Sequence, residues 1–228
     1  VSGNSNLKDT TVNGSLGVTG DQNVGGSSTI TGNQNVGGSS TITGNSTVKG
    51  DLSVNGNSNL KDTTVNGSLG VTGDQNVGGS STITGNQNVG GSSTITGNST
   101  VKGDLSVSGN SNLKDTTVNG SLGVTGDQNV GGSSTITGNQ NVGGSSTITG
   151  NSTVKGDLSV NGNSNLKDTT VNGSLGVTGD QNVGGSSTIT GNQNVGGSST
   201  ITGNSTVKGD LSVSGNSNLK DTTVNGSL

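Results

Sequence analysis

Residues 18–36 read VTGDQNVGGSSTITGNQNV, and an aliphatic residue falls at every sixth position of this stretch. These residues are Val18, Val24, Ile30 and Val36. A six-residue period matches neither an α-helix nor the two-residue alternation of a long strand. It fits a strand of about three residues followed by a bend, with the aliphatic side chain pointing inward and its neighbours outward. The stretch therefore predicts one unit of a regular β-structure.

The same spacing runs through the whole chain, inside a larger repeat of 53 residues. Each repeat holds eight six-residue steps and one five-residue step, which passes through the letters KDTT. The repeats 1–53, 54–106, 107–159 and 160–212 and the partial repeat 213–228 predict one continuous shaft. The predicted structural core consists of Val18, Val24, Ile30, Val36, Ile42, Val48, Val54, Leu60, Val65 and their equivalents at 53-residue intervals.

The composition excludes an ordinary globular core. The chain uses ten residue types, of which Gly accounts for 46 positions, and hydrophobic residues make up 21% with no aromatic residue. Composition alone favours disorder, because so few apolar groups cannot offset the entropy of the chain. The regular aliphatic spacing favours a solenoid instead, in which each coil is stabilised by its neighbours. We therefore predict an all-β fold, a repetitive β-solenoid with a six-residue beat.

The remaining positions of the six-residue unit predict corners and a second inward site. Gly at the third place and Asn, Asp or Ser at the fourth suit a corner, because these types tolerate left-handed backbone angles or bond their own backbone. In the five-residue step, Asp62 is expected to replace the usual Gly and to tighten the corner. The residue two places before each aliphatic residue also points inward. At Gln22 and Gln34 this requires partners for a buried amide, either a ladder of Gln side chains or a central water.

Two architectures share this pattern. In an intertwined trimeric β-helix, which we favour, three chains wind around one axis and neighbouring strands lie about six residues apart on different chains. In a single-chain triangular β-helix, three steps complete a coil of about 18 residues. Thr29, Thr47 and Thr64 would then form an outward ladder, whereas in the trimer Thr29 would lie near Asn23 and Asn35.

The stretch TGNSTVKGDLSVNGNSNLKDTTVNGSLGV at 43–71 resembles the shaft repeats of bacteriophage tail fibres and related trimeric adhesive fibres. This resemblance implies a homotrimer of intertwined β-structure. The chain contains none of the aromatic clusters or His-rich metal sites of fibre tips, so these features are not carried over. The six-residue beat is also similar to that of hexapeptide-repeat left-handed β-helices, whose catalytic His has no counterpart here. Phrases such as VKGDLSV are similar to those of bactofilins, which polymerise.

The residue types predict no chemistry. The chain has no His, Cys, Glu, Arg or Tyr, so catalysis would depend on Asp, Lys, Ser or Thr. We interpret the neighbouring charges Lys49 with Asp51 and Lys61 with Asp62 as solvated surface groups, and we predict no enzyme, no cofactor and no catalytic residue. Calcium binding through Asp21, Asn33 and Asp51 is not expected, because one Asp at each corner gives too little charge. Nine scattered Lys without Arg or aromatic residues predict no nucleic-acid binding, and no apolar run predicts membrane insertion.

The predicted function is that of a structural fibre or filament shaft, a stiff spacer outside a cell, on its surface or on a virion. The predicted partner is the chain itself, as a homotrimer or as an end-to-end polymer; receptor or host contacts are not predicted. One alternative is a single-chain β-helix that polymerises into a surface filament or adhesin. Another is an ice- or glycan-binding repeat, although the TIT motifs at 29–31 and 41–43 fall on different sides of a triangular coil, which makes a poor ice lattice.

Overall fold

The computed structural model describes residues 1–228 and consists of strands joined by short corners, with no helix. Each coil contains three strands, and the strands up to β31 each pair in parallel with the strand three places further along the chain. The predicted all-β solenoid is therefore confirmed. The contacts divide the chain into two compact units, Val1–Lys114 and Asp115–Leu228, which we describe one at a time. The three sides of each unit are called A, B and C, and strands at the same place in the coil carry the same letter.

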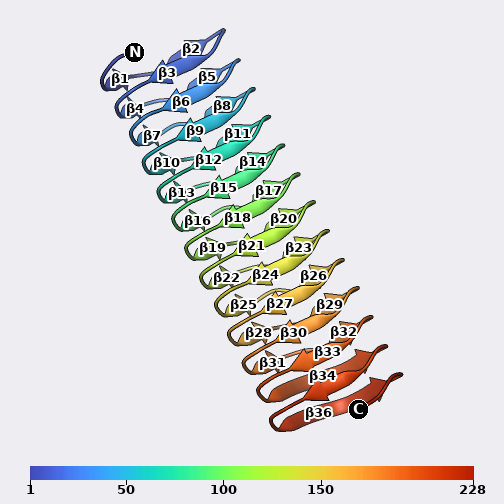
Figure 1. Cartoon of the computed structure of the whole chain (residues 1–228). Helices are drawn as coiled ribbons and strands as arrows, with labels where there is room; N and C mark the ends of the chain where they lie inside the picture. Colours follow the sequence, from blue (N-terminus) through green and yellow to red (C-terminus); the bar gives the residue numbers. More distant parts are fainter. The chain divides into compact units, whose positions relative to one another are not determined.

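In the first unit the coils stack in parallel (Figure 1). Side A consists of β1 (Ser5–Leu7), β4 (Gln22–Val24), β7 (Ser40–Ile42), β10 (Ser58–Leu60), β13 (Gln75–Val77), β16 (Ser93–Ile95) and β19 (Ser111–Leu113). Side B consists of β2 (Thr10–Val12), β5 (Ser28–Ile30), β8 (Ser46–Val48), β11 (Thr63–Val65), β14 (Ser81–Ile83) and β17 (Ser99–Val101). Side C consists of β3 (Leu16–Val18), β6 (Gln34–Val36), β9 (Leu52–Val54), β12 (Leu69–Val71), β15 (Gln87–Val89) and β18 (Leu105–Val107).

The second unit repeats this arrangement. Its side A contains β22 (Gln128–Val130), β25 (Ser146–Ile148), β28 (Ser164–Leu166) and β31 (Gln181–Val183). Its side B contains β20 (Thr116–Val118), β23 (Ser134–Ile136), β26 (Ser152–Val154), β29 (Thr169–Val171) and β32 (Ser187–Ile189). Its side C contains β21 (Leu122–Val124), β24 (Gln140–Val142), β27 (Leu158–Val160), β30 (Leu175–Val177), β33 (Gln193–Val195) and β35 (Leu211–Val213). The longer strands β34 (Ser199–Val207) and β36 (Ser217–Val224) run from side A around the corner onto side B.

Neighbouring strands on each side come from successive coils of one chain. Thr29 pairs with Thr47 in the next coil, and Thr47 pairs with Thr64 in the coil after that. These are the pairs expected for the single-chain triangular β-helix, and the outward Thr ladder is present. In this one-chain structure every coil is completed by the same chain, while association of three chains stays a prediction.

Side chains alternate between the inside and the outside of each coil. The middle residue of a strand points outward, and the two residues beside it are buried, as in Ser28 and Ile30 of β5. All the aliphatic residues predicted for the core, from Val18 to Val65, are at most 5% exposed. Equivalents in the end coils are exceptions, such as Val1 at 64% and the half-buried Val213, because no further coil covers them on one side. Burying each Val, Leu or Ile contributes about 1.5–3 kcal/mol.

The five-residue step shortens one corner, as expected, but not in the way that the sequence suggested. The N–H of Gly79 donates to the carbonyl oxygen of Lys61 at 2.7 Å, so Lys61 occupies the backbone place of the corner glycine. Asp62 takes the place of the polar corner residue, because its Oδ1 accepts the N–H of Ser80 at 2.8 Å. The expectation that Asp62 replaces the glycine is therefore wrong. Compared with a six-residue step, the five-residue step lacks the residue that precedes the corner glycine.

The polar corner residues form hydrogen-bonded columns between coils. In the corner between sides B and C, Asn33 N–H donates to Ser15 Oγ at 3.0 Å, Asp51 N–H to Asn33 Oδ1 at 3.0 Å, and Ser68 N–H to Asp51 Oδ1 at 2.8 Å. The other two corners contain similar columns. Each side chain thus accepts the N–H of its equivalent one coil further along. The expectation that these residues bond their own backbone is wrong. Their side-chain oxygens face the next coil and accept its backbone N–H groups.

The corner glycines are needed because neighbouring coils approach closely. A Cβ atom on Gly97 would lie 2.6 Å from the carbonyl carbon and oxygen of Gly79 in the coil before it. In the same place the N–H of Gly97 donates to Gly79 O at 2.9 Å. Gly3 alone has a positive φ, at 89°, so left-handed backbone is not the reason for the other glycines. This part of the sequence interpretation is wrong, and the steric contact between coils replaces it.

The inward glutamines form pairs across the core. Gln22 on side A and Gln34 on side C are fully buried, and Gln34 Nε2 donates to Gln22 Oε1 at 2.5 Å. Gln87 Nε2 donates to Gln75 Oε1 in the same way one repeat later. The glutamines form no ladder along the axis, because the coils before and after carry Ser on side A and Leu on side C at these positions. Each pair therefore belongs to one coil in three.

Candidate functional surfaces

Side B presents an unbroken column of threonine hydroxyls and methyl groups. The middle residues of its strands in the first unit are Thr11, Thr29, Thr47, Thr64, Thr82 and Thr100. The residues that follow the inward aliphatic residue vary from coil to coil, as Asn13, Thr31 and Lys49 show. Only one column on this side is uniform, because the second changes with the three-coil repeat.

Side A presents a column of amide and hydroxyl groups. Its middle residues in the first unit are Asn6, Asn23, Thr41, Asn59, Asn76, Thr94 and Asn112. Asn23 Nδ2 donates to Asn6 Oδ1 at 3.0 Å, and Asn76 Nδ2 donates to Asn59 Oδ1 at 3.1 Å. These bonds join neighbouring coils, so part of the polar surface of side A also stabilises the stack.

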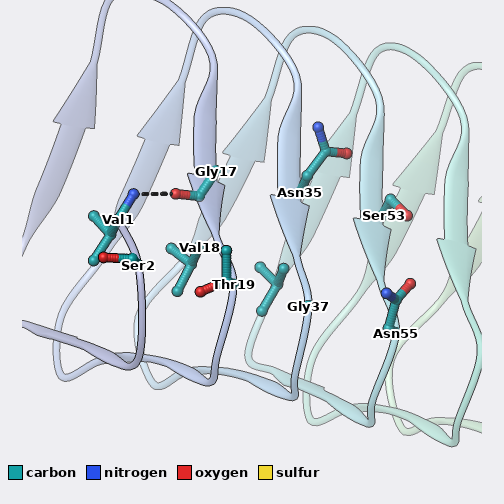
Figure 2. Close-up of a pocket in the computed structure, with 10 residues that line it drawn as sticks. Val1, Ser2, Gly17, Val18, Thr19, Asn35, Gly37, Ser53 and Asn55 are labelled. Atoms are coloured by element: carbon teal, nitrogen blue, oxygen red, sulfur yellow. Dashed lines mark hydrogen bonds between the residues drawn. The ribbon is translucent and has the colours of Figure 1, made fainter.

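Side C has the smallest residues at the middle of its strands, and, like the three-residue strands of sides A and B, its strands lack charged residues. Its middle residues in the first unit are Gly17, Asn35, Ser53, Gly70, Asn88 and Ser106. Two shallow hollows of about 640 Å³ and about 340 Å³ lie over this side of the first unit. Figure 2 shows the first of them, where Asn35 projects from the strand beside Gly17 and the amino group of Val1 donates to Gly17 O at 2.6 Å.

The charged residues lie at the corners and are distributed unequally. All nine Lys lie at the A–B and B–C corners, together with nine Asp. The C–A corner carries the remaining four, Asp21, Asp74, Asp127 and Asp180, which account for the net charge of −4. The three-coil period separates these four residues regularly. One edge of each unit is therefore acidic, while the other two carry both signs.

The residues considered for calcium are not brought together. Asp21 lies at the C–A corner, whereas Asn33 and Asp51 lie at the B–C corner in successive coils, where one oxygen of each accepts a backbone N–H. The structure contains no group of three or more His, Cys, Asp or Glu side chains that could hold a metal ion. No helix of the structure is long and apolar enough to cross a membrane.

The sequence reasoning missed two features of these surfaces. One is the set of corner columns, which the regular change from Asn to Asp to Ser at fourth positions one coil apart, as in Asn33, Asp51 and Ser68, could have indicated. The other is the glycine at the middle of the strand on side C, at Gly17 and Gly70, which differs from the corner glycines by standing directly before an inward Val.

The stacked parallel coils and the tandem repeat define the class of the chain, a three-sided β-solenoid built of near-identical repeats. No protein-family model matches the chain, and no curated protein or solved structure matches it either. The resemblance to tail-fibre shafts, hexapeptide-repeat helices and bactofilins therefore stays a prediction.

Proposed function

We propose that the chain is a structural shaft, a stiff spacer that acts outside a cell, on a cell surface or on a virion and performs no chemistry of its own. The observation that carries this proposal is the unbroken set of hydrogen-bonded columns within each unit. Three strand ladders and three corner columns join every coil to the next, and they use both the backbone and the side chains. A solenoid joined in this way resists bending because a bend must distort several columns at once.

The core supports the same role. Between the end coils, each coil buries two inward residues on each of its three sides, and the same set of residues returns after every 53 residues, that is, every three coils. In such a solenoid the stability of a coil comes from its nearest neighbours, so repeats can be added without changing the existing core. Repeat number would thus set length, which is the property that a spacer requires.

The structure supports the single-chain form of this shaft, because paired strands belong to successive coils of one chain. Self-association remains part of the proposal, either as a homotrimer or as a polymer joined end to end. Native mass separates these forms, since a homotrimer would have three times the single-chain mass of 21.8 kDa at all concentrations, whereas the mass of a polymer would rise with concentration.

The length of the particle is expected to increase linearly with the number of repeats. Each added 53-residue repeat contributes three coils, which corresponds to about 14 Å at the usual strand spacing. Chains with four, eight and twelve repeats, imaged by negative-stain electron microscopy, would measure this increment. A flexible chain would instead extend with about the square root of the number of residues. A square-root dependence, or particles without a defined long axis, would contradict the stiff-spacer proposal.

The threonine column on side B favours a second candidate, a surface that binds ice. A flat strand ladder with a hydroxyl and a methyl group in every coil could order water at a regular spacing. The Lys of the adjoining column interrupts this surface in every third coil, so we expect a small effect. Measurable thermal hysteresis that disappears in a Thr47→Lys, Thr64→Lys variant would support it. The absence of hysteresis and of ice-crystal shaping at millimolar concentration would exclude it.

A further inference from the structure

Neither the space nor the backbone of the fold requires the glycines at the middle of the side C strands. A Cβ atom on Gly17 or Gly70 would meet nothing within 4 Å, and neither glycine has a positive φ. The same holds for Gly123 and Gly176 in the second unit. Other coils carry Asn or Ser in this column, so the strand accepts a side chain there.

Glycine in a strand weakens it, since it adds conformational entropy to the unfolded chain and offers no side chain to pack. A strand glycine that the fold does not need often marks a place where another backbone approaches closely. These glycines recur at intervals of 53 residues, as the repeat does. An approaching surface that fits each of them must therefore have the same period, and a second copy of this chain has that period.

The shape of the side C surface is compatible with contact between two copies. The hollow around Gly17 extends to Gly37, and the hollow around Gly70 extends to Gly90. Asn35 projects beside the first hollow (Figure 2). Between its corners this side carries no charged side chain, and its one charge is the α-amino group of Val1 at the first coil. Burial of the other coils against a second copy would therefore leave no charged group without water.

The charges at the two edges of side C select the orientation of the copies. One edge is the C–A corner, with Asp21 and Asp74, and the other is the B–C corner, with Lys49 and Lys102 beside Asp residues. If two copies face each other with their coils stacked in the same direction, the acidic edge of each lies beside the mixed edge of the other. If the directions are opposite, the two acidic edges meet and repel. Charge therefore favours the parallel arrangement.

We propose that side C is a self-association surface, through which each unit pairs in parallel with the same unit of a second copy of this chain, around a two-fold axis along the coil stack of that unit, with the strand glycines of one copy against those of the other. This arrangement rests on the proposed structural role of the shaft, and it takes the place of the homotrimer and the end-to-end polymer as the form in which shafts associate. The contact is isologous, so it closes as a dimer.

Sedimentation equilibrium of two charge-matched variants tests the surface. One variant carries Gly17→Lys, Gly70→Lys, Gly123→Lys and Gly176→Lys, and the control carries the same change on side B of the same coils, at Thr11, Thr64, Thr117 and Thr170. We expect the unchanged chain and the control to have twice the mass of 21.8 kDa, and the glycine variant to associate at least tenfold more weakly. Circular dichroism with thermal melting verifies that the glycine variant keeps its fold.

A mass of one chain or of three chains for the unchanged protein would overturn the proposal, as would equal association of the two variants. If the glycine variant fails to fold, cysteine cross-linking tests the same surface. The chain contains no Cys, so an introduced Cys can form a disulfide only with its copy in another chain. The variant Ser53→Cys, on side C, should form a disulfide-linked dimer under mild oxidation, while Thr47→Cys, on side B, should not. Equal cross-linking would overturn the proposal.

The outcome for this surface is separable from that for the shaft itself. If the stiff-spacer proposal fails, particle length does not scale linearly with repeat number. If only the pairing fails, single chains still form particles of linear length, and the mass stays that of one chain. Particle length is measured on chains with different numbers of repeats, and mass is measured on the unchanged chain and its variants, so each result tests only its own proposal.

Discussion

The substitution Gly97→Ala is expected to destabilise the solenoid by about 2–4 kcal/mol, a large effect for one methyl group. The added Cβ would lie 2.6 Å from backbone atoms of Gly79, and backbone cannot turn aside as a side chain can. The overpacking accounts for about 1–3 kcal/mol, and separation of the two corners would also weaken the hydrogen bond from Gly97 N–H to Gly79 O, at about 1 kcal/mol. Urea unfolding followed by circular dichroism measures the sum.

The matched control is Gly70→Ala, in the same unit and in the same repeat. Its Cβ would meet nothing within 4 Å, and the strand backbone suits alanine. Removing a glycine from the unfolded ensemble then stabilises the single chain by up to about 1 kcal/mol, when unfolding is measured at a concentration too low for pairing through side C. The two substitutions are chemically identical and are expected to act in opposite directions. A similar loss of stability in both would show that glycine is required for a reason other than the approach of neighbouring coils.

Hydrogen exchange should localise the effect of Gly97→Ala. In a solenoid each coil contacts mainly its nearest neighbours, so damage is expected to remain close to the substitution. Amide protons of β13 and β16, which flank the Gly79–Gly97 contact, should exchange faster, whereas those of β4 should keep their protection. Uniform acceleration throughout the first unit would contradict nearest-neighbour stability.

The period of the sequence predicted the fold because a solenoid repeats its environment at every coil. The inward aliphatic residues follow from spacing alone, and the spacing also predicted that inward positions occur in pairs, as Ser28 and Ile30 show. These features depend on strand alternation, which the sequence contains. The ladder of Thr29, Thr47 and Thr64 was expected only for the single-chain β-helix and not for the favoured trimer, because the spacing did not decide how many steps of one chain complete a coil.

The corners could not be predicted in the same way, because their residues act on the next coil rather than on their own turn. The side chain of Asp51 accepts the N–H of Ser68, which lies one coil further along the chain. Gly and Asn at a bend are usually explained by left-handed backbone angles or by bonds to their own backbone. That local explanation was chosen from the sequence, whereas contacts between neighbouring coils account for these residues here. The glycines of side C were overlooked for a related reason, since a count of glycines does not separate Gly70, at the middle of a strand, from Gly97, at a corner.

The last prediction concerns the buried glutamines. The substitution Gln75→Ser is expected to lower stability when it is made alone, but not when three further substitutions accompany it. Gln75→Ser removes the acceptor of the hydrogen bond from Gln87 Nε2. Gln87 Oε1 has no hydrogen-bond partner within the chain, so the whole amide of Gln87 would then be buried without one. We expect a loss of about 2–4 kcal/mol, of which about 1–3 kcal/mol comes from the unpaired amide and the rest from the space that the smaller side chain leaves.

Adding Val77→Ile, Ile83→Val and Gln87→Leu to Gln75→Ser should restore stability to that of the unchanged chain or above it. The core of this coil then equals that of the coil formed by β16, β17 and β18, in which Ser, Ile and Leu fill the same positions without an amide. Replacing both members of a buried polar pair by well-packed groups is often neutral or stabilising, whereas removing one is costly. Urea unfolding of the single variant, the fourfold variant and the unchanged chain measures this non-additivity. If the fourfold variant were as unstable as Gln75→Ser, the glutamine pair would contribute to the fold by more than mutual hydrogen bonding, and the interchangeability of the coils would be wrong.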